Sequence, residues 1–430
     1  MLHAAHHRLQ FFRQSGWMLL ATTLGGICMW AVHIPAQRFM PKPEYGVFVT
    51  MLQVMNLMLI PAIGLQTVFA QQTAAATTDR CRHQLAFTVR RLLFAVLMLW
   101  LAAAAGAWVF RAELLTKWKI ANPATLWLTL GVGLAMLWWP IFQGVLQGRQ
   151  NFLWLGSLQM VNGVVRLAGV ALIVALLGGW AAGAMVAVFI GFWVSVAVAA
   201  WPTRDLCFGR GEPLAWSDWL RRVIPLTLGL GASQFMMAAD QIVVQRVFSD
   251  EVTGVYSAAG IIGRALVFFT GPLMAVMFPK IVASAARDQR TDVLGQALGA
   301  TALLGLLAAM ACTLLPELPL RIISGTTYLE SAPLVPWFAW CMLPLTLSNV
   351  LIGSLLARQR YEAVPWLVLI AVLYGAALTW RADLVRTAEP AVAFKHVVQT
   401  LGLFSTVLLA VAAWFAWRRK RSGPGTVAEA

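Results

Sequence analysis

Two stretches of the chain, 208 positions apart, decide the fold: QRFMPKPEYGVF at residues 37–48 and QRVFSDEVTGVY at residues 245–256. In both, a Gln-Arg pair precedes a Gly-Val-aromatic triplet at the same distance. A second pair of landmarks follows, because LQGRQNF at 146–152 resembles LLARQRY at 355–361. Matching landmarks at matching spacing indicate that one unit of sequence has been duplicated.

The amino-acid composition indicates whether this unit folds in water or in a membrane. Of the 430 residues, 60% are hydrophobic and only 11% are charged, whereas a soluble domain carries about 25% charged residues. No soluble fold hides so much apolar surface, so lipid is expected to be part of the solvent. A soluble enzyme, a disordered protein and a fibrous repeat are excluded. The five cysteines form no CxxC pair or Cys/His cluster, which argues against a disulfide framework and a zinc site.

A transmembrane helix needs about 20 mostly apolar residues, and the sequence offers twelve such spans. The predicted spans are 15–37, 46–70, 89–110, 124–147, 153–177, 180–201, 222–247, 254–280, 294–315, 333–356, 363–380 and 396–417. The predicted fold class is therefore all-α, a polytopic membrane protein of about twelve transmembrane helices in two six-helix bundles. An even number of helices per unit gives two halves of the same orientation, related by an axis along the membrane normal.

The duplication divides the chain into four predicted segments. An N-terminal six-helix bundle covers 1–201, a cytoplasmic linker covers 202–221, and a C-terminal six-helix bundle covers 222–417. A basic cytoplasmic tail occupies 418–430. With the N-terminus placed in the cytoplasm, the cytoplasmic segments hold about twice as many Lys and Arg as the outer ones, so both termini are predicted to be cytoplasmic. The net charge of +15 is then a topology signal, and no nucleic-acid partner is expected.

Asp240 and Arg264 are charged residues placed deep inside consecutive spans. At a rise of 1.5 Å per residue, Asp240 lies about 10 Å and Arg264 about 15 Å from the outer ends of their helices. The two spans are antiparallel, so the sequence predicts an ion pair between these side chains. One interpretation makes Asp240 an ion-coupling or gating residue; the other makes the pair a structural contact between neighbouring helices.

Arg166 lies near the middle of the fifth span, with Asn162 one turn before it on the same face. It has no acidic partner at its depth in the N-terminal half. One interpretation is an anion-binding site in a wet cavity, since arginine binds phosphate through two hydrogen bonds and stays charged. The alternative is an arginine satisfied by backbone carbonyls or by snorkelling. In the first case, Arg166 and Arg264 face a common positive chamber between the halves.

Arg38 and Arg246 occupy equivalent places in the two halves, at the outer mouth. A phosphate-handling role and a role as interfacial anchors are both open, with the anchor favoured, and nearby His33 is expected to be a histidine satisfied by its neighbours. The sequence contains no HExxH, GxSxG or Walker motif and no large loop. Neither enzymatic activity nor a cofactor nor a metal site is predicted.

The run from Gly16-Trp17 to Glu44-Tyr45-Gly46-Val47-Phe48 resembles the first two helices of bacterial polysaccharide and O-antigen flippases of the multidrug/oligosaccharidyl-lipid/polysaccharide superfamily. Residues 240–244 with 254–259 look like their seventh and eighth helices, and 147–152 is similar to their loop after the fourth. Fourteen-helix lipid II flippases share the superfamily, and this chain lacks their two extra helices.

The resemblance implies transport of a polyprenyl-pyrophosphate-linked oligosaccharide, such as an O-antigen or lipopolysaccharide precursor, across the bacterial inner membrane by alternating access. An ion gradient would drive it, with Asp240 as the protonatable candidate, and Arg166, Arg264, Asn162, Arg38 and Arg246 are the substrate-binding candidates. The expected partners are the lipid-linked substrate, membrane lipids, and a glycan polymerase or glycosyltransferases.

Two other functions stay open. The first is an antiporter of small cationic compounds, which would favour an acid-rich cavity, whereas this sequence offers two intramembrane arginines against one aspartate. The second is a non-transporting scaffold of a glycan-assembly complex. A scaffold would tolerate neutralisation of Arg166 and Arg264 without loss of glycan export.

Overall fold

The computed structural model describes residues 2–208, 212, 216–267, 293–386 and 389–418, and helices are the only regular elements in these ranges. The N-terminal half comprises α1 (Leu2–Ala31), α2 (His33–Phe39), α3 (Lys42–Ile63), α4 (Leu65–Ala75), α5 (Asp79–Val109), α6 (Arg111–Lys117), α7 (Pro123–Gly148), α8 (Phe152–Val170) with a π-helical turn Ala171–Leu176, α9 (Trp180–Ala200), a 3-10 turn Trp201–Thr203 and α10 (Arg204–Phe208). The C-terminal half comprises α11 (Trp216–Val247), a helix over 250–267, α13 (Val293–Leu314), α14 (Glu317–Ser324), α15 (Val335–Ala357), α16 (Val364–Arg386) and α17 (Pro390–Trp417), with 3-10 turns Leu329–Leu334 and Tyr361–Ala363.

The predicted fold class is confirmed. Ten helical stretches of the described chain are long and apolar enough to cross a membrane, and α11 and the helix over 250–267 supply the seventh and eighth of the twelve predicted spans. Helix α11 carries Asp240, Gln241 and Gln245 inside its span, and only residues 254–267 of the eighth span are described. The part 268–280 of the predicted eighth span, and most of the tail 418–430, lie outside the described residues.

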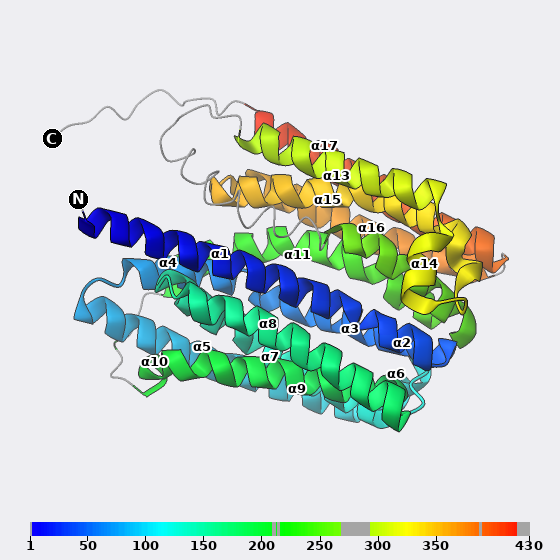
Figure 1. Cartoon of the computed structure of the whole chain (residues 1–430), viewed down its shortest axis with the longest axis horizontal. Coiled ribbons are helices and arrows are strands. Elements are labelled where there is room, and N and C mark those ends of the chain that lie inside the picture. Colours follow the sequence, from blue (N-terminus) through cyan, green and yellow to red (C-terminus); the bar gives the residue numbers. More distant parts are fainter. Residues whose placement is uncertain (1, 209–211, 213–215, 268–292, 387–388, 419–430) are drawn as a thin grey trace.

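The two halves use the same helix pairs, as a duplication requires. The first span packs on the fifth in each half, as α1 on α8 and α11 on α16, and the fourth packs on the sixth, as α7 on α9 and α15 on α17. The N-terminal half fills the lower part of Figure 1 and the C-terminal half the upper part. Helix α1 begins, and α17 ends, at the end of the molecule that also carries α10; α2, α6 and α14 lie at the opposite end (Figure 1).

The second pair of landmarks has one structural role in both halves. Gln150 and Gln359 adopt left-handed backbone angles, with φ of 56° and 55°, which end α7 and α15 in the same way. In these loops Arg149 donates to the carbonyl of Pro202 at 3.0 Å, and Arg360 donates to that of Phe415 at 2.7 Å. Each arginine thus satisfies a free carbonyl near the end of the last span of its own half.

The first landmark contains two of the glycines at which the halves touch. A Cβ atom on Gly254 would lie 2.3 Å from the carbonyl oxygen of Lys42, and one on Gly46 would lie 3.2 Å from the amide nitrogen of Gly254. Only glycine allows the helix over 250–267 to approach α3 so closely. The duplicated Gly is therefore a packing residue between the halves.

The helices differ from the predicted spans mainly at their ends. Helix α5 starts at Asp79, ten residues before the predicted span, where the hydroxyl of Thr78 accepts a hydrogen bond from the amide of Cys81. The second span is divided into α3 and α4 at Gly64, just after Pro61. The short helices α6 and α14 were not predicted, because a criterion based on membrane-length apolar runs passes over them.

Candidate functional site

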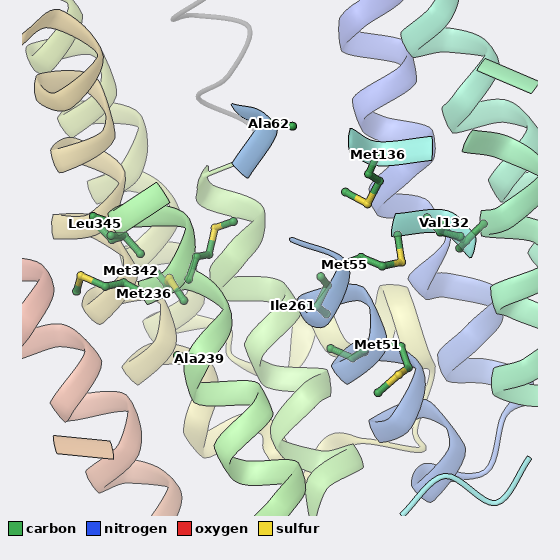
Figure 2. Close-up of a cluster of buried hydrophobic side chains, with 14 of the residues drawn as sticks. Met51, Met55, Ala62, Val132, Met136, Met236, Ala239, Ile261, Met342 and Leu345 are labelled. Carbon is green, nitrogen blue, oxygen red and sulfur yellow. The ribbon is translucent and has the colours of Figure 1, made fainter. Parts of the chain in front are cut away.

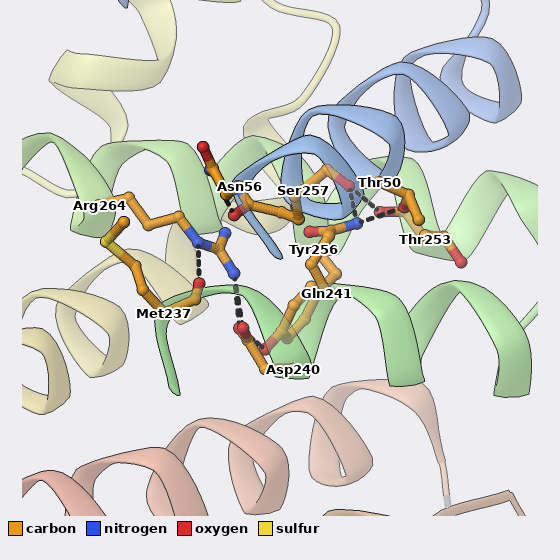
Figure 3. A network of polar contacts seen from close by, with 10 residues as sticks. Thr50, Asn56, Met237, Asp240, Gln241, Thr253, Tyr256, Ser257 and Arg264 are labelled. Atoms are coloured by element: carbon orange, nitrogen blue, oxygen red, sulfur yellow. Dashed lines mark hydrogen bonds and ion pairs between the residues drawn. The ribbon is translucent and has the colours of Figure 1, made fainter. Parts of the chain in front are cut away.

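The predicted ion pair between Asp240 and Arg264 is confirmed. Nη2 of Arg264 lies 2.8 Å from Oδ1 and 2.7 Å from Oδ2 of Asp240, and the two side chains are 1% and 0% exposed. Helix α11 carries the aspartate and the following helix, over 250–267, carries the arginine, and Figure 3 shows them pointing toward each other. The two partners are therefore the residues that were predicted from their depth in the spans.

Further groups hold this pair in place. The hydroxyl of Tyr256 donates to Oδ2 of Asp240 at 2.7 Å, and Nε of Arg264 donates to the carbonyl of Met237 at 3.1 Å. The guanidinium also lies 5.9 Å from the ring of Phe338. Nη1 of Arg264 packs over Gly260, where a Cβ would lie 2.4 Å away, and no described residue forms a hydrogen bond with this nitrogen. The pair is thus charge-balanced, with one donor nitrogen unused.

Next to the pair, a chain of uncharged polar side chains connects the halves (Figure 3). Nε2 of Gln241 donates to the hydroxyls of Ser257 at 2.7 Å and of Thr50 at 3.3 Å. Thr50 in turn donates to Oε1 of Gln245 at 3.2 Å, which links α3 to α11. This network was not predicted from the sequence, where its signal is a set of amide and hydroxyl residues one turn apart inside apolar spans.

A related cluster lies around Tyr45 in the N-terminal half. Nε2 of Gln37 donates to the Tyr45 hydroxyl at 2.7 Å, and Nδ1 of His33 lies 3.1 Å from the same oxygen. All three side chains are buried. His33 is therefore satisfied by a neighbouring side chain, as expected.

Arg166 has a different environment from Arg264. It is 5% exposed on α8, and among the described residues it forms no ion pair or hydrogen bond; its Nε atom is buried without a partner. Its methylene groups pack over Gly191, where a Cβ would lie 2.5 Å from Cγ, and its guanidinium lies 5.4 Å from the ring of Phe192. Both side-chain polar atoms of the fully buried Asn162 also lack partners.

Arg166 and Arg264 both lie within electrostatic range of His33 in the first span. The positive charges of Arg166 and of Arg264 both act on the His33 ring, so one arginine from each half lies near the first span. The buried methionines Met51, Met55 and Met136 in the N-terminal half, and Met236 and Met342 in the C-terminal half, occupy the region drawn in Figure 2. Methionine repacks easily, which suits helices that change their relative position. A common chamber stays a prediction.

The outer arginines lie apart from this region. Arg38 donates to the carbonyls of Ile322 at 2.8 Å and Ile323 at 3.1 Å, at the C-terminal end of α14 where helix carbonyls are free. Arg246 is exposed at the end of α11, and its charge acts on Glu113. This environment of Arg38 favours the anchor interpretation over phosphate handling.

Polar contacts between the halves gather at the same end of the molecule. Lys42 pairs with Glu330, and Nζ of Lys119 lies 3.4 Å from Oδ1 of Asp250. Nε2 of Gln245 donates to the carbonyl of Trp118 at 3.3 Å. Together with Arg38, these contacts hold the halves together near α2 and α14.

The family model described as polysaccharide biosynthesis protein matches residues 11–284. A comparison with curated protein sequences finds no significant match.

Three solved structures show the same fold at low identity. An inward-facing multidrug resistance MATE family transporter of the MOP superfamily has a TM-score of 0.69 at 12% identity, covering 92% of this chain and 93% of that one. The lipid II flippase MurJ, in an inward closed conformation, has a TM-score of 0.68 at 12% identity, with coverage of 92% and 87%. A MOP superfamily transporter from Pyrococcus furiosus has a TM-score of 0.67 at 12% identity, with 94% of each chain covered.

These comparisons confirm the resemblance inferred from the sequence motifs. At such identities the structural likeness concerns the fold, whereas the family match spans more than half of the sequence. The chain therefore belongs to the polysaccharide biosynthesis protein family and has the fold of the MOP superfamily transporters.

Proposed function

We propose that this protein moves a pyrophosphate-linked oligosaccharide, carried on a polyprenyl lipid, across the bacterial inner membrane by alternating access of its two halves. The observation that carries the proposal is Arg166, buried within a membrane span with no partner among the described residues and with an unpartnered Asn162 one turn away. A charge in this position costs at least about 2.5–3.5 kcal/mol in a membrane, and an anionic ligand would offset that cost.

The chemistry of this site favours phosphate over a cation. A guanidinium donates two parallel hydrogen bonds to phosphate oxygens and stays charged at every physiological pH, and the Asn162 amide adds a donor and an acceptor for a sugar or a phosphate. A cationic drug would be repelled by Arg166, and Asp240 is already neutralised by Arg264. The small-cation antiporter is therefore the weaker candidate.

Asp240 is the proposed coupling residue. Its carboxylate binds the guanidinium of Arg264 and the hydroxyl of Tyr256. A proton or a sodium ion that reached Asp240 would compete with Arg264 and release it toward the substrate. The contacts between the halves near α2 and α14 would break when the transporter opens at that end. Both termini would lie in the cytoplasm. Glycosyltransferases or a glycan polymerase would be the protein partners.

Glycan export in cells that lack the native protein tests the proposal. Outer-surface glycan is measured and normalised to the amount of protein in the membrane. We expect Arg166→Gln to abolish most export and Arg166→Lys to retain part of it, because charge matters first and bidentate geometry second. Arg111→Gln, an exposed arginine stacked on Trp108 at 4.5 Å, is the matched control and should export normally. Full export by Arg166→Gln would refute the substrate role and favour the scaffold.

A further inference from the structure

A hollow of about 420 Å³ lies on the outer face of α5 and is lined by Phe87, Arg90, Arg91 and Phe94. These residues follow the spacing i, i+3, i+4, i+7, so they form one face of the helix. The guanidinium of Arg91 lies 5.4 Å from the ring of Phe87. Two adjacent cations between two aromatic rings are a combination that the proposed transport does not use.

The position of the hollow indicates a lipid ligand. No residue in the most apolar stretch of α5 is fully buried, and the helix packs on α4, α6, α7 and α10 of its own half. The hollow therefore faces the surroundings of the protein instead of the region between the halves. It lies on the part of α5 nearer to the end where α1 begins (Figure 1). The sequence places the membrane boundary here, since the predicted span starts at residue 89.

The chemistry of the lining identifies the class of lipid. The arginines supply charge-assisted donors for a phosphate, and basic pockets at membrane boundaries bind acidic head groups. Beyond the arginines, Phe94, Met98 and Leu101 are 57%, 40% and 45% exposed on the same side of α5, which provides a track for an acyl chain. The four lining side chains contain no acceptor, so the hydroxyl groups of an oligosaccharide could accept hydrogen bonds there but not donate them.

We propose that this face of α5 is a binding site for an anionic phospholipid of the surrounding leaflet, with its phosphate between Arg90 and Arg91 and an acyl chain along Phe94, Met98 and Leu101. Arg90 lies next to α10, where its charge acts on Cys207, while Arg91 is exposed. A bound phospholipid would join α5 to α10 and fix the peripheral third span against its half. The site is independent of the proposed transport function.

Native mass spectrometry of the purified full-length protein tests this site. Phosphatidylglycerol and phosphatidylcholine are titrated separately, and the dissociation constant of the most retained lipid is measured. We expect the wild-type protein to bind phosphatidylglycerol more tightly than phosphatidylcholine. The double variant Arg90→Gln/Arg91→Gln should weaken phosphatidylglycerol binding roughly 30-fold, because each arginine contributes about 1 kcal/mol. The consecutive exposed arginines at the start of α11 are the matched control, and Arg221→Gln/Arg222→Gln should leave binding unchanged.

A single variant and a second class of lipid provide two further tests of the site. If the double variant does not fold, Arg91→Gln alone retains the contact of Arg90 with α10 and should still weaken phosphatidylglycerol binding about fivefold. Equal affinity for the two phospholipids, or unchanged binding in the α5 variants, would overturn the site. A polyprenyl diphosphate that binds more tightly than phosphatidylglycerol, and loses this advantage in Arg91→Gln, would assign the hollow to the transport substrate instead.

Discussion

Arg264 and Arg166 are both buried arginines, one in each half, yet within the described part of the chain only Arg264 has a counter-ion. Arg264 binds both oxygens of Asp240, whereas Arg166 has a ring, a glycine and an unsatisfied asparagine around it. The repeat offset of 208 shows where the difference arises, because Asp240 corresponds to Val32 and Arg264 to Asn56. The duplication preserved the scaffold, while each half placed its charge on a different helix.

This difference separates two uses of a buried charge. A neutralised pair contributes to the packing of one half and is costly to break, because either partner alone leaves an uncompensated charge. An unpaired arginine contributes little to packing and remains available to a ligand. Changes at Arg166 should therefore lower transport with little loss of stability, whereas changes at the pair should lower both.

The largest expected effect comes from breaking the pair. Asp240→Asn or Arg264→Gln alone should destabilise the protein by about 3–5 kcal/mol, since each leaves a buried charge. The double variant Asp240→Asn/Arg264→Gln should regain much of this loss, because no charge remains. Thermal unfolding in detergent measures the effect. Equal losses in the single and double variants would mean that the pair does not act as a unit.

An acidic neighbour should convert Arg166 from an unpaired arginine into a member of a neutralised ion pair. Asn162→Asp places a carboxylate one turn away on α8, where it can pair with Arg166. We expect a thermal stability at least equal to that of the wild type. Export should fall at least roughly tenfold, because the new carboxylate would compete with the substrate for Arg166, and a hydrogen bond to a charged group is worth about 1.5–3 kcal/mol. Asn162→Gln keeps the amide and is the control. Unimpaired export by Asn162→Asp would remove Arg166 from the substrate path.

A smaller effect is expected where the halves touch. Gly254→Ala brings a methyl group against the Lys42 carbonyl, and such overpacking costs about 1–3 kcal/mol. Gly299→Ala on α13, where a Cβ meets nothing within 4 Å, should be neutral or stabilising. Thermal unfolding compares the two variants. If Gly254→Ala leaves the unfolding temperature unchanged, α3 and the helix over 250–267 can move apart without a loss of stability.

The smallest effect should come from the exposed pair of Lys42 and Glu330. Their side chains are 31% and 53% exposed, and such pairs contribute about 0–1 kcal/mol. Lys42→Gln/Glu330→Gln should change the unfolding temperature little, in contrast to loss of the buried pair. The same variant should bias the halves toward opening at the α14 end, which cysteine accessibility near α14 would report. A large stability loss would mean that this contact is better shielded from water than its exposure indicates.

Some features followed from the sequence alone. Apolar runs of membrane length determined the all-α class and the twelve spans, because lipid requires every backbone group to be satisfied within a helix. The landmarks 208 residues apart determined the duplication. The pairing of Asp240 with Arg264 also followed, since consecutive antiparallel spans and a fixed rise per residue place the two at similar depth.

Other features were decided by tertiary structure. Arg38 reaches the carbonyls of α14, a helix nearly 300 residues further along the chain, and Thr50 reaches Gln241 and Gln245 in the other half. Neither contact leaves a local pattern, because helical periodicity reports which face is apolar and not which distant helix packs on it. Whether Arg166 has a partner likewise depends on what surrounds it from all sides. The sequence could show that its own half has no acid at its depth, and only the packed helices could show that no other group among the described residues takes that place.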